Sequence, residues 1–381
     1  MLPDPAALRV LQVLPALETG GVERGTVEIA AAIAGAGGAA LVASAGGRMV
    51  PEIVDAGGRH VTLPLASKNP WRIWRNAAPL ATLIRAQRVR IVHARSRAPA
   101  WSALLAARRT GALFVTTYHG VYAENFPGKR RYNAVMAKGA RVIAISRHVA
   151  RQVEARHGVP RERIRVIPRG VDAAVFDPAA VAEERVRGLT AAWALPPGPV
   201  VMLPGRVTAW KGGMLLVEAL ARMARRDVIG VLLGPSEDKA GFVARLRQHA
   251  AALGVADRLR LLPRCDDMPA ALLAADCVVN ASLEPEPFGR TVIEAQAMAR
   301  PVVVADHGGP AETVEDGVTG WRVLPGDAAA LAAALDHVLA LSEAERAAIG
   351  ARARETVTIR YTLTAMQQAT LAVYAELLSG S

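Results

Sequence analysis

The chain has 381 residues, of which 52% are hydrophobic, and a formal net charge of +12. This length exceeds what one hydrophobic core usually serves, so two domains are expected; the two cysteines, Cys265 and Cys277, exclude a disulfide framework and fit a reducing cytoplasm. The first residues lack a basic segment and an apolar stretch, so no signal peptide is predicted. The longest uncharged run, Ile29 to Gly47, is broken by glycines and is typical of a helix end, a loop and a strand rather than a membrane span.

The positive charge is concentrated in the N-terminal half. Residues 1–190 contain 28 Lys or Arg against 13 Asp or Glu, whereas residues 191–381 contain 18 against 21. Positions 56–123 contain eleven Lys or Arg and no acidic residue. A segment of this kind favours an anionic partner, which is a membrane surface, an anionic acceptor or a nucleic acid.

Strand and helix patterns alternate along this half. A buried strand is expected at 8–14 and a helix at 22–34. Further strands, separated mostly by helical patterns, are expected at 39–43, 59–63, 90–93, 113–118, 141–145 and 165–168. Such alternation predicts a parallel sheet with helices on both faces.

A helix expected from Trp71 to Arg88 opens with a mixture of tryptophan and arginine, Lys68-Asn69-Pro70-Trp71-Arg72-Ile73-Trp74-Arg75. Helices that lie in a membrane interface have this composition. The alternative is a helix that packs on the core and exposes a basic face to solvent, which can have the same composition. The missing acidic residues around this helix favour the first interpretation, a surface that faces a bilayer.

Two groups in this half follow predicted strands, at the edge where parallel sheets bind ligands. Gly20 and Gly21 have the wrong spacing for a dinucleotide fingerprint; they permit a ligand to approach the backbone, or they form a structural turn. His119 is placed to reach a donor sugar, or it has a structural role. The poorly periodic segment from Asp177 to Gly198 is expected to connect the two domains.

Alternation restarts after this segment. A strand at 200–204 runs into a loop bounded by Gly205 and Gly213, which contains Arg206 and Lys211. Two cations in a strand-to-helix loop suit a diphosphate, although a solvated loop has the same composition. The remaining strands are expected at 228–233, 259–262, 277–280 and 301–305, and the helices at 214–225, 331–341, 344–356 and 361–378.

The stretch from Glu286 to Glu294 reads as a loop that enters a helix, with Thr291 as a candidate N-cap. The first amides of a helix have no internal partner and lie at the positive end of its dipole, so they bind a phosphate. Glu286 lies before the helix and Glu294 about one turn inside it, and carboxylates hydrogen-bond sugar hydroxyls. This pattern predicts a nucleotide sugar; the alternative is a Pro-Gly loop followed by an ordinary surface helix.

Taken together, these segments resemble retaining glycosyltransferase family 4, which has the GT-B architecture. The resemblance is carried by six motifs spread over most of the chain: G-G-V-E-R at 20–24, Y-H-G at 118–120, A-I-S at 144–146, I-P-R-G-V-D at 167–172, G-R-V-x-x-W-K-G at 205–212 and E-P-F-G-R-T-V-I-E-A at 286–295. Residues 93–101, H-A-R-S-R-A-P-A-W, resemble members that build bacterial lipopolysaccharide and related envelope glycans.

The resemblance implies a role for each predicted site residue. Arg206 and Lys211 would bind the donor diphosphate, Glu294 the ribose and Glu286 the transferred sugar. Backbone amides would hold the sugar and phosphates at Phe288, Gly289, Arg290 and Thr291. His119 would lie beside the sugar, and Gly20 and Gly21 would line the donor side facing the acceptor. At Arg169 many members have Asn, so this residue is left out of the predicted donor contacts.

The expected fold is therefore α/β, with two Rossmann-like domains and a cleft between them. The predicted boundaries are 1–180 for the acceptor-side domain, 181–198 for the connection, 199–357 for the nucleotide-sugar domain and 358–381 for a helix that crosses back. The expected activity transfers a hexose-like sugar, with retention, from a nucleoside diphosphate sugar such as a UDP- or GDP-sugar to a hydroxyl of a lipid-linked or lipopolysaccharide-type acceptor. The expected location is cytoplasmic, at the inner face of the membrane.

No metal or other cofactor is expected, because the sequence has no Asp-x-Asp and no His/Cys cluster with metal-ligand spacing. Three alternatives remain open at this point: a sugar-nucleotide epimerase of the same fold, a nucleic-acid-binding protein, and a glycan-binding or scaffold protein with an inactive site. The basic half contains no recognised nucleic-acid motif, so no nucleic-acid partner is expected.

Overall fold

The computed structural model describes residues 4–234 and 240–380. The chain forms two compact units. Unit 1 comprises Met1–Arg169 with Leu363–Ser381, and unit 2 comprises Gly170–Thr362. Each unit has its own parallel sheet and its own hydrophobic core.

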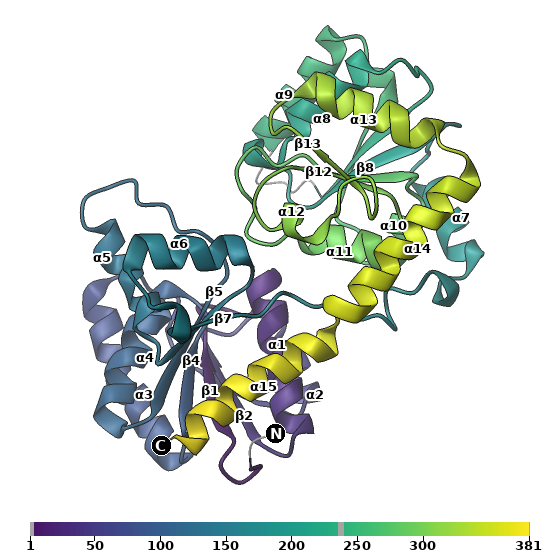
Figure 1. The fold of residues 1–381 in the computed structure, drawn as a ribbon. Coiled ribbons are helices and arrows are strands. Elements are labelled where there is room, and N and C mark those ends of the chain that lie inside the picture. The colour runs from purple at the N-terminus through teal and green to yellow at the C-terminus, as the bar shows by residue number, and fades with distance from the viewer. Residues whose placement is uncertain (1–3, 235–239, 381) are drawn as a thin grey trace. The chain divides into compact units, whose positions relative to one another are not determined.

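Unit 1 contains a seven-stranded sheet with the order β3-β2-β1-β4-β5-β6-β7 (Figure 1). Every pair of neighbouring strands is parallel. The strands are β1 (Arg9–Val13), β2 (Ala39–Ser44), β3 (Arg59–Thr62), β4 (Ile91–Ala94), β5 (Leu113–Tyr118), β6 (Arg141–Ala144) and β7 (Ile164–Val166). Val10 and its neighbour Leu11 on β1 are both fully buried although they point to opposite sides, so helices cover both faces.

The helices of unit 1 connect these strands and close the fold. They are α1 (Gly21–Gly35), α2 (Val50–Asp55), α3 (Pro70–Ala86), α4 (Arg97–Thr110), α5 (Lys129–Asn133), η1 (Ala134–Lys138), α6 (Arg147–His157), η2 (Arg161–Arg163) and α15 (Leu363–Ser379). Helices α1 and α15 pack on each other, and α3 packs along α4. Side chains of α1, α2 and α15 share one apolar core with the strands.

Unit 2 contains a six-stranded sheet with the order β10-β9-β8-β11-β12-β13. All neighbouring strands are again parallel. The strands are β8 (Val200–Pro204), β9 (Ile229–Leu233), β10 (Leu259–Leu262), β11 (Cys277–Asn280), β12 (Val302–Ala305) and β13 (Trp321–Val323). Alternate residues of β8 belong to two different cores, Val201 to one and Met202 to the other, so this sheet is also covered on both faces.

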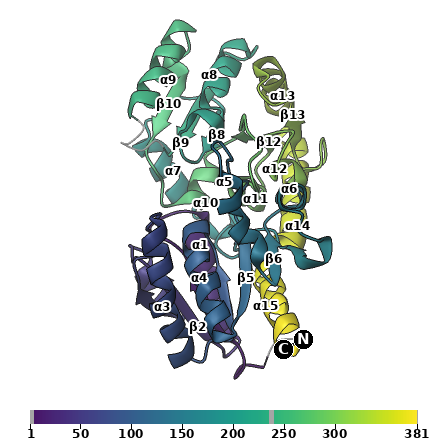
Figure 2. The same ribbon diagram turned by 90° about the vertical axis from the view of Figure 1, so that its left-hand side faces the viewer.

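Helices α8, α9 and α13 pack on one side of this sheet and α7, α10 and α11 on the other (Figure 2). The helices of unit 2 are η3 (Pro178–Ala180), α7 (Glu183–Ala192), η4 (Ala209–Lys211), α8 (Gly213–Arg222), α9 (Ala240–Ala252), η6 (Ala256–Arg258), α10 (Met268–Leu273), α11 (Arg290–Ala297), α12 (Pro310–Thr313), α13 (Ala328–Ala340) and α14 (Glu343–Arg360).

The order of strands reverses once in each sheet. In unit 1 the chain turns back between β1 and β4, and in unit 2 between β8 and β11. The loops after these two strands leave the sheet in opposite directions, which opens a crevice at the carboxyl ends of the strands. Ligand sites are therefore expected beside β1 and β4 in unit 1 and beside β8 and β11 in unit 2.

The boundaries of the compact units differ from the predicted ones. The chain divides after Arg169 and after Thr362, not at 180 and 358. Residues 181–198, predicted as a connection, include α7, and Leu189 and Trp193 pack on a core of unit 2. No residue of α7 is fully buried, so the segment lacks the apolar stripe that would have revealed a helix.

The uncharged run at 29–47 forms the end of α1, a loop and β2, as predicted. Among the described residues, no helix combines the length and the apolar character that crossing a bilayer requires. The short strand β13 and the short helices α10 and α12 were not predicted. Each has six residues or fewer, which is too short for a periodic pattern to stand out.

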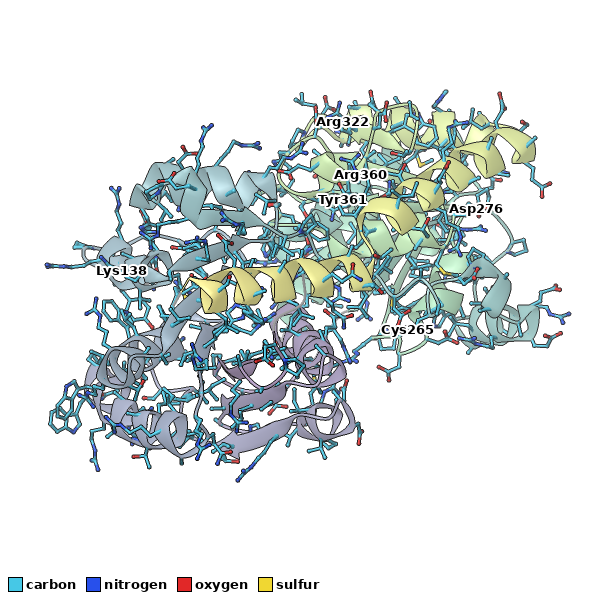
Figure 3. All side chains as sticks on the ribbon, turned by 60° about the horizontal axis from the view of Figure 1, so that its bottom comes forward. Lys138, Cys265, Asp276, Arg322, Arg360 and Tyr361 are labelled. Carbon is cyan, nitrogen blue, oxygen red and sulfur yellow. The ribbon has the colours of Figure 1, made fainter. Side chains whose placement is uncertain are left out.

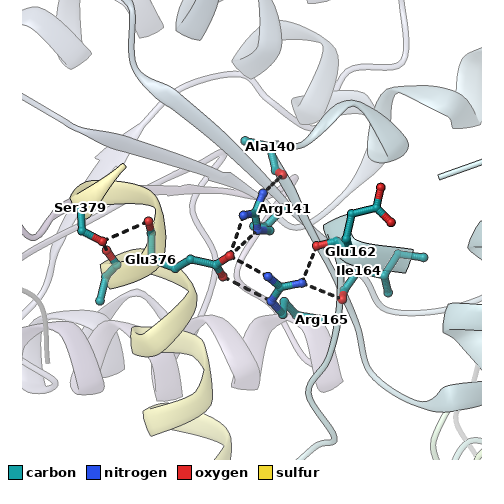
Figure 4. Close-up of polar contacts among 8 residues, drawn as sticks. Ala140, Arg141, Glu162, Ile164, Arg165, Glu376 and Ser379 are labelled. Carbon is teal, nitrogen blue, oxygen red and sulfur yellow. Dashed lines mark hydrogen bonds and ion pairs between the residues drawn. The ribbon is translucent and has the colours of Figure 1, made fainter. Parts of the chain in front are cut away.

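Helix α15 is attached to unit 1 by apolar and polar contacts. Tyr374 is fully buried in the core, and its hydroxyl lies 2.6 Å from Nδ1 of His93. Near the end of the helix, Glu376 accepts hydrogen bonds from Arg141 on β6 and Arg165 on β7, each at 2.6 Å (Figure 4). The contact with Arg141 first, and that with Arg165 next, lower the pKa of the Glu376 carboxyl.

We expect Glu376→Gln to lower stability at neutral pH by about 1 kcal/mol, because the side chain is 37% exposed and water screens the pair. A carboxylate whose pKa is lowered in the folded state adds stability above its ordinary pKa of 4.5 and loses it as the pH falls through the folded value. The difference in melting temperature between the natural protein and the variant should thus shrink from pH 7 to pH 3.5. The control is Glu355→Gln, which removes an exposed carboxylate of α14. If the difference in melting temperature between the natural protein and Glu376→Gln stays constant from pH 7 to pH 3.5, the lowered pKa of Glu376 is contradicted.

Candidate functional site

Three loops meet at the carboxyl edge of the unit 2 sheet, beside the reversal of strand order. They follow β8, β11 and β12. The amide of Leu283 donates to the carbonyl of Trp210 at 2.7 Å, and the amide of Gly309 donates to the carbonyl of Glu286 at 2.7 Å. Nε2 of His307 lies 2.7 Å from the carbonyl oxygen of Ser282. These bonds fix the loops to one another, so the side chains that they carry have defined positions.

Glycine is required at two points where these loops touch. Gly212 has a φ of +80°, and a Cβ there would lie 1.9 Å from the carbonyl oxygen of Ala281. Gly308 has a φ of +66°, and a Cβ there would lie 2.5 Å from the carbonyl oxygen of Glu286. Any side chain at either position would push the loops apart, because backbone atoms cannot yield as a flexible side chain does.

Lys211 and Glu286 form an ion pair at the centre of this edge. Nζ of Lys211 lies 2.6 Å from Oε1 of Glu286, and the two side chains are 14% and 13% exposed. The other carboxylate oxygen of Glu286 accepts from Nδ2 of Asn280 at 2.8 Å and from the hydroxyl of Ser282 at 3.1 Å. Both oxygens are thus bonded, and Glu286 is held in one orientation. The sequence assigned these two residues to different parts of the donor; the structure adds that they position each other.

Helix α11 begins directly after this pair. Its N-cap is Gly289, with a φ of +85°, and its first residue is Arg290. The prediction that Thr291 caps the helix is wrong, because the left-handed backbone of Gly289 already turns the chain into the helix and places Thr291 inside the first turn. Among the described residues no side chain caps the first amides. These amides have the geometry that binds an anion.

Other predicted residues lie around the start of α11. Arg290 and Glu294 are one turn apart, with Nε and Oε1 at 3.4 Å, and Glu294 is mostly buried. The side chain of Phe288 is buried and its ring centroid lies 6.1 Å from that of Tyr361, the residue that follows α14 (Figure 3). Phe288 therefore anchors the loop.

Arg206 differs from Lys211 although both are cations of the same loop. Its side chain is exposed, and it makes no hydrogen bond or ion pair with residues 4–234 and 240–380. Lys211 is fixed by Glu286 and lies 4.6 Å from the ring centroid of Trp210. The loop thus offers one fixed cation and one that is free to follow an anionic ligand.

The remaining predicted residues belong to unit 1, at the carboxyl edge of its own sheet. Gly20 is the N-cap of α1, which begins at Gly21, and His119 directly follows β5. Nη2 of Arg169 donates to the carbonyl oxygen of Gly21 at 3.0 Å and also contacts Nδ1 of His119. Arg169, which the sequence analysis left out of the donor contacts, thus links two of the predicted groups.

The charge state of His119 follows from its surroundings. Burial is the main reason why its pKa lies well below the ordinary value, and the positive charges of Arg169 and Arg95 lower it further. The ring is therefore neutral at pH 7. Because a guanidinium only donates, Nδ1 accepts from Arg169, and the proton of the ring is on Nε2.

Sequence reasoning missed the residues that support Glu286. Asn280 is the last residue of β11, and Ser282, His307 and Gly308 lie in the loops after β11 and β12. Their position after apolar strands was a usable signal, since parallel strands bring all their carboxyl ends to one edge. No group of three or more His, Cys, Asp or Glu side chains that could hold a metal ion occurs in the described part of the chain.

Two family models match the chain, one over each half. Residues 19–175 match Glycosyltransferase Family 4, and residues 193–356 match Glycosyl transferases group 1. A crystal structure of a glycosyltransferase from Rickettsia africae is 37% identical, with a TM-score of 0.91, and the match covers 98% of this chain and 99% of that one. Anabaena HepE in complex with UDP-glucose is 23% identical, with a TM-score of 0.83 over 98% of this chain and 99% of that one, and it shares the fold.

Curated relatives match over a shorter part. The D-inositol 3-phosphate glycosyltransferase of Nocardia farcinica is 36% identical over 215 residues, which are 54% of this chain and 46% of that protein. The chain thus spans about half the length of the curated relatives that it matches. The two parallel sheets, the two family models and the Rickettsia structure agree with the predicted GT-B fold and confirm it. The chain belongs to the family 4-type glycosyltransferases.

Proposed function

We propose that the protein transfers a hexose-like sugar from a nucleoside diphosphate sugar, such as a UDP- or GDP-sugar, to an acceptor hydroxyl, with retention of anomeric configuration and without a metal ion. The observation that supports this most directly is the fixed pair of Lys211 and Glu286 directly before the uncapped start of α11. A cation, a carboxylate and free amides beside one another match the diphosphate and the hydroxyls of such a donor.

In this proposal unit 2 stabilises the leaving group. Departure of the sugar builds negative charge on the diphosphate, and groups that are already oriented stabilise it without reorganising. Lys211, Arg206 and the amides of Gly289 to Thr291 supply this stabilisation, Glu294 binds the ribose and Glu286 binds the sugar. The same fold holds UDP-glucose in Anabaena HepE.

Retention follows if the acceptor attacks from the face that the diphosphate leaves, with a phosphate oxygen taking the acceptor's proton. No carboxylate of the enzyme then acts as a nucleophile, which distinguishes this site from the paired carboxylates of retaining hydrolases. Glu286 fits a binding role, because both of its oxygens are engaged by Lys211, Asn280 and Ser282. His119 of unit 1, with its donor at Nε2, is proposed to lie beside the sugar.

For the acceptor we propose a lipid-linked or lipopolysaccharide-type glycan at the cytoplasmic face of the membrane. The resemblance at 93–101 and the basic character of residues 56–123 support this class. Curated relatives are named for D-inositol 3-phosphate, which is also an anionic acceptor. Both kinds of acceptor carry negative charge, and a basic unit attracts either one.

Helix α3 supports contact with a membrane surface. Ile73, Leu80 and Ile84 are buried, whereas Trp71 and Trp74 are 63% and 51% exposed and their ring centroids lie 5.1 Å apart. The helix thus packs on the core through its aliphatic side chains, and the two tryptophans lie outside that contact. Exposed Arg and Lys side chains lie on the same helix or just outside its ends, at Lys68, Arg72, Arg75, Arg85 and Arg88. Exposed tryptophan between basic residues suits the interface of an anionic bilayer.

The donor proposal predicts that one nucleoside diphosphate stabilises the protein. Thermal melting with UDP, GDP, ADP and CMP, in EDTA and in Mg²⁺, is expected to show a rise of a few degrees for one base at about 100 times its dissociation constant, equally in both buffers. Glu294→Ala should abolish most of this rise, whereas Glu218→Ala, on the surface of α8, should keep it. No response to any nucleotide would sink the donor site, and a response only in Mg²⁺ would reject metal independence.

The two cations should differ in their effects. Arg206→Ala is expected to lower kcat/KM for transfer about 100-fold and to leave stability within about 0.5 kcal/mol, because the side chain is exposed and unpaired among the described residues. Lys211→Ala should lower kcat/KM and also cost on the order of 1–3 kcal/mol of stability, because it leaves Glu286 with a partly buried charge and no cation.

Initial rates and denaturant unfolding measure the two quantities separately. Arg352→Ala on the surface of α14 is the control and should change neither. Equal losses of stability in Arg206→Ala and Lys211→Ala would contradict the pairing of Lys211 with Glu286.

Product analysis by NMR gives the anomeric configuration of the glycoside that is formed. Turnover of donor with no glycoside formed would identify an epimerase instead.

The membrane proposal predicts that the protein sediments with vesicles that contain anionic lipid at low salt, and not with neutral vesicles. Changing Trp71 and Trp74 together to Ser is expected to weaken this binding at least about tenfold, because the apolar part of the contact is lost. Ile359→Ser, which removes an exposed apolar side chain of unit 2, serves as the control. If the natural protein stays in solution with anionic vesicles at low salt, α3 is not a membrane surface.

A further inference from the structure

Two arginines are buried together in unit 1. Arg95 and Arg169 are only 2% and 5% exposed. A Cβ placed on Gly25 of α1 would lie 2.2 Å from Nη1 of Arg169 and 2.9 Å from Nη2 of Arg95. Both guanidinium groups therefore approach the same point on α1, and any side chain at position 25 would displace them. Buried arginines are uncommon, because taking a cation out of water is costly unless bound groups compensate for it.

The arginines lie where a ligand is expected. Arg95 directly follows β4 and Arg169 follows β7, so both are at the carboxyl edge of the sheet. Nη1 of Arg95 donates to Oε1 of Gln12 on β1 at 3.0 Å. This bond spans β1 and β4, the two strands between which the strand order reverses. In open parallel sheets this is the ligand-binding position.

The cluster has donors that the protein does not use. Within the described part of the chain, Nε of Arg95 and Nε2 of His119 are buried and have no hydrogen-bond partner. The tautomer of His119 makes its Nε2 a donor, and Nε of an arginine is always a donor. A buried donor without an acceptor costs about 1–3 kcal/mol, so native proteins rarely keep one without a reason. Two such donors in one cluster indicate a ligand that brings acceptor oxygens.

The surrounding charges favour an anion. Burial lowers the pKa of Arg95 to about 10, although Tyr374, Glu28 and Glu23 act in the opposite direction. The guanidinium is thus charged at pH 7 and lacks full compensation. The pKa of the neighbouring His93 is also lowered, by burial first and then by Arg95 and Arg169. The positive charges of the two arginines thus lower the pKa values of both His93 and His119.

We infer that Arg95 and Arg169, which lie next to His119, form a binding site for an oxyanion, a phosphate or a carboxylate, that the acceptor substrate carries. The inference rests on the proposed glycosyl transfer and specifies its acceptor as an anionic sugar or polyol. The planar guanidinium groups suit either oxyanion because each can donate two parallel hydrogen bonds. A pocket built from buried donors discriminates strongly against a neutral analogue, which would leave those donors unbound.

The test uses the full chain with its donor site already filled. The nucleoside diphosphate that stabilises the protein is added to saturation, so that an added anion cannot bind at α11. Calorimetric titrations then compare glucose 6-phosphate, glucuronate, inorganic phosphate and glucose. We expect at least one of the two charged sugars to bind ten times more tightly than glucose. The two sugars distinguish a phosphate from a carboxylate, and inorganic phosphate reports whether the oxyanion binds without the sugar.

Two variants test the residues. Arg169→Asn and Arg95→Gln are each expected to reduce the affinity for the charged sugar at least tenfold, with the affinity for the nucleotide unchanged. Arg97→Gln is the matched control, because Arg97 also donates to a side-chain amide of unit 1, Oδ1 of Asn133 at 2.9 Å, but lies outside the cluster. Melting curves show whether each variant is folded. Should Arg95→Gln fail to fold, Arg169→Asn carries the test, since many family members have Asn at this position.

Equal affinity for charged and neutral sugars in the natural protein would overturn the inference. So would a preference for the charged sugar that both variants retain. Failure of the proposed function gives a different result, because no nucleotide then binds. In that case the titration with charged sugars is repeated without nucleotide, and it still measures whether the arginine cluster binds an anion. If the nucleotide binds normally but charged and neutral sugars bind with equal affinity, only the acceptor site is rejected and the proposed donor site stands.

Discussion

The ion pair between Lys211 and Glu286 is the contact on which the site in unit 2 depends. The loop after β8 carries the lysine and the loop after β11 carries the glutamate, and neither loop contains a regular element long enough to fix its side chains. Asn280 and Ser282 complete the shell of Glu286. Glycines at 212 and 308 permit the close approach that the pair requires. Preorganisation of this kind is what electrostatic stabilisation of a leaving group needs, since no charge then has to move during the reaction.

Unit 1 has the same architecture and uses it differently. Its strand order also reverses once, and polar groups also gather at the carboxyl edge. There, however, the cations are two buried arginines rather than a lysine paired with a glutamate, and His119 is kept neutral among them. A neutral histidine next to cations is suited to donating a hydrogen bond and not to carrying charge. The fold explains where each site lies, and the side chains explain which ligand each site suits.

Much of the fold could be predicted, because buried parallel strands are continuous apolar runs and the helices between them have apolar faces. The position of the candidate site residues at the carboxyl edge of the unit 2 sheet could be predicted as well, since Arg206, Lys211, Glu286 and Glu294 all follow apolar strands. Pairing could not be predicted: nothing in the spacing shows that Lys211 bonds Glu286, 75 positions away. Thr291 was misassigned because Ser and Thr are frequent N-caps. The spacing does not show that Gly289 is left-handed, or that a Cβ there would lie 2.7 Å from Cγ of Pro310.

Residues 56–123, which contain no acidic residue, show most clearly that composition does not reveal which cations are exposed and which are buried. Their eleven cations look alike in the sequence, yet Arg72 and Arg75 are exposed beside Trp71 and Trp74, while Arg95 is buried. An exposed arginine acts through long-range attraction, which salt screens within about 10 Å. A buried arginine acts through hydrogen bonds of fixed direction, which salt screens far less. The same residue type therefore suits two tasks, general attraction to an anionic surface and recognition of one anionic group, and burial separates the arginines of this segment that suit the first from Arg95, which suits the second.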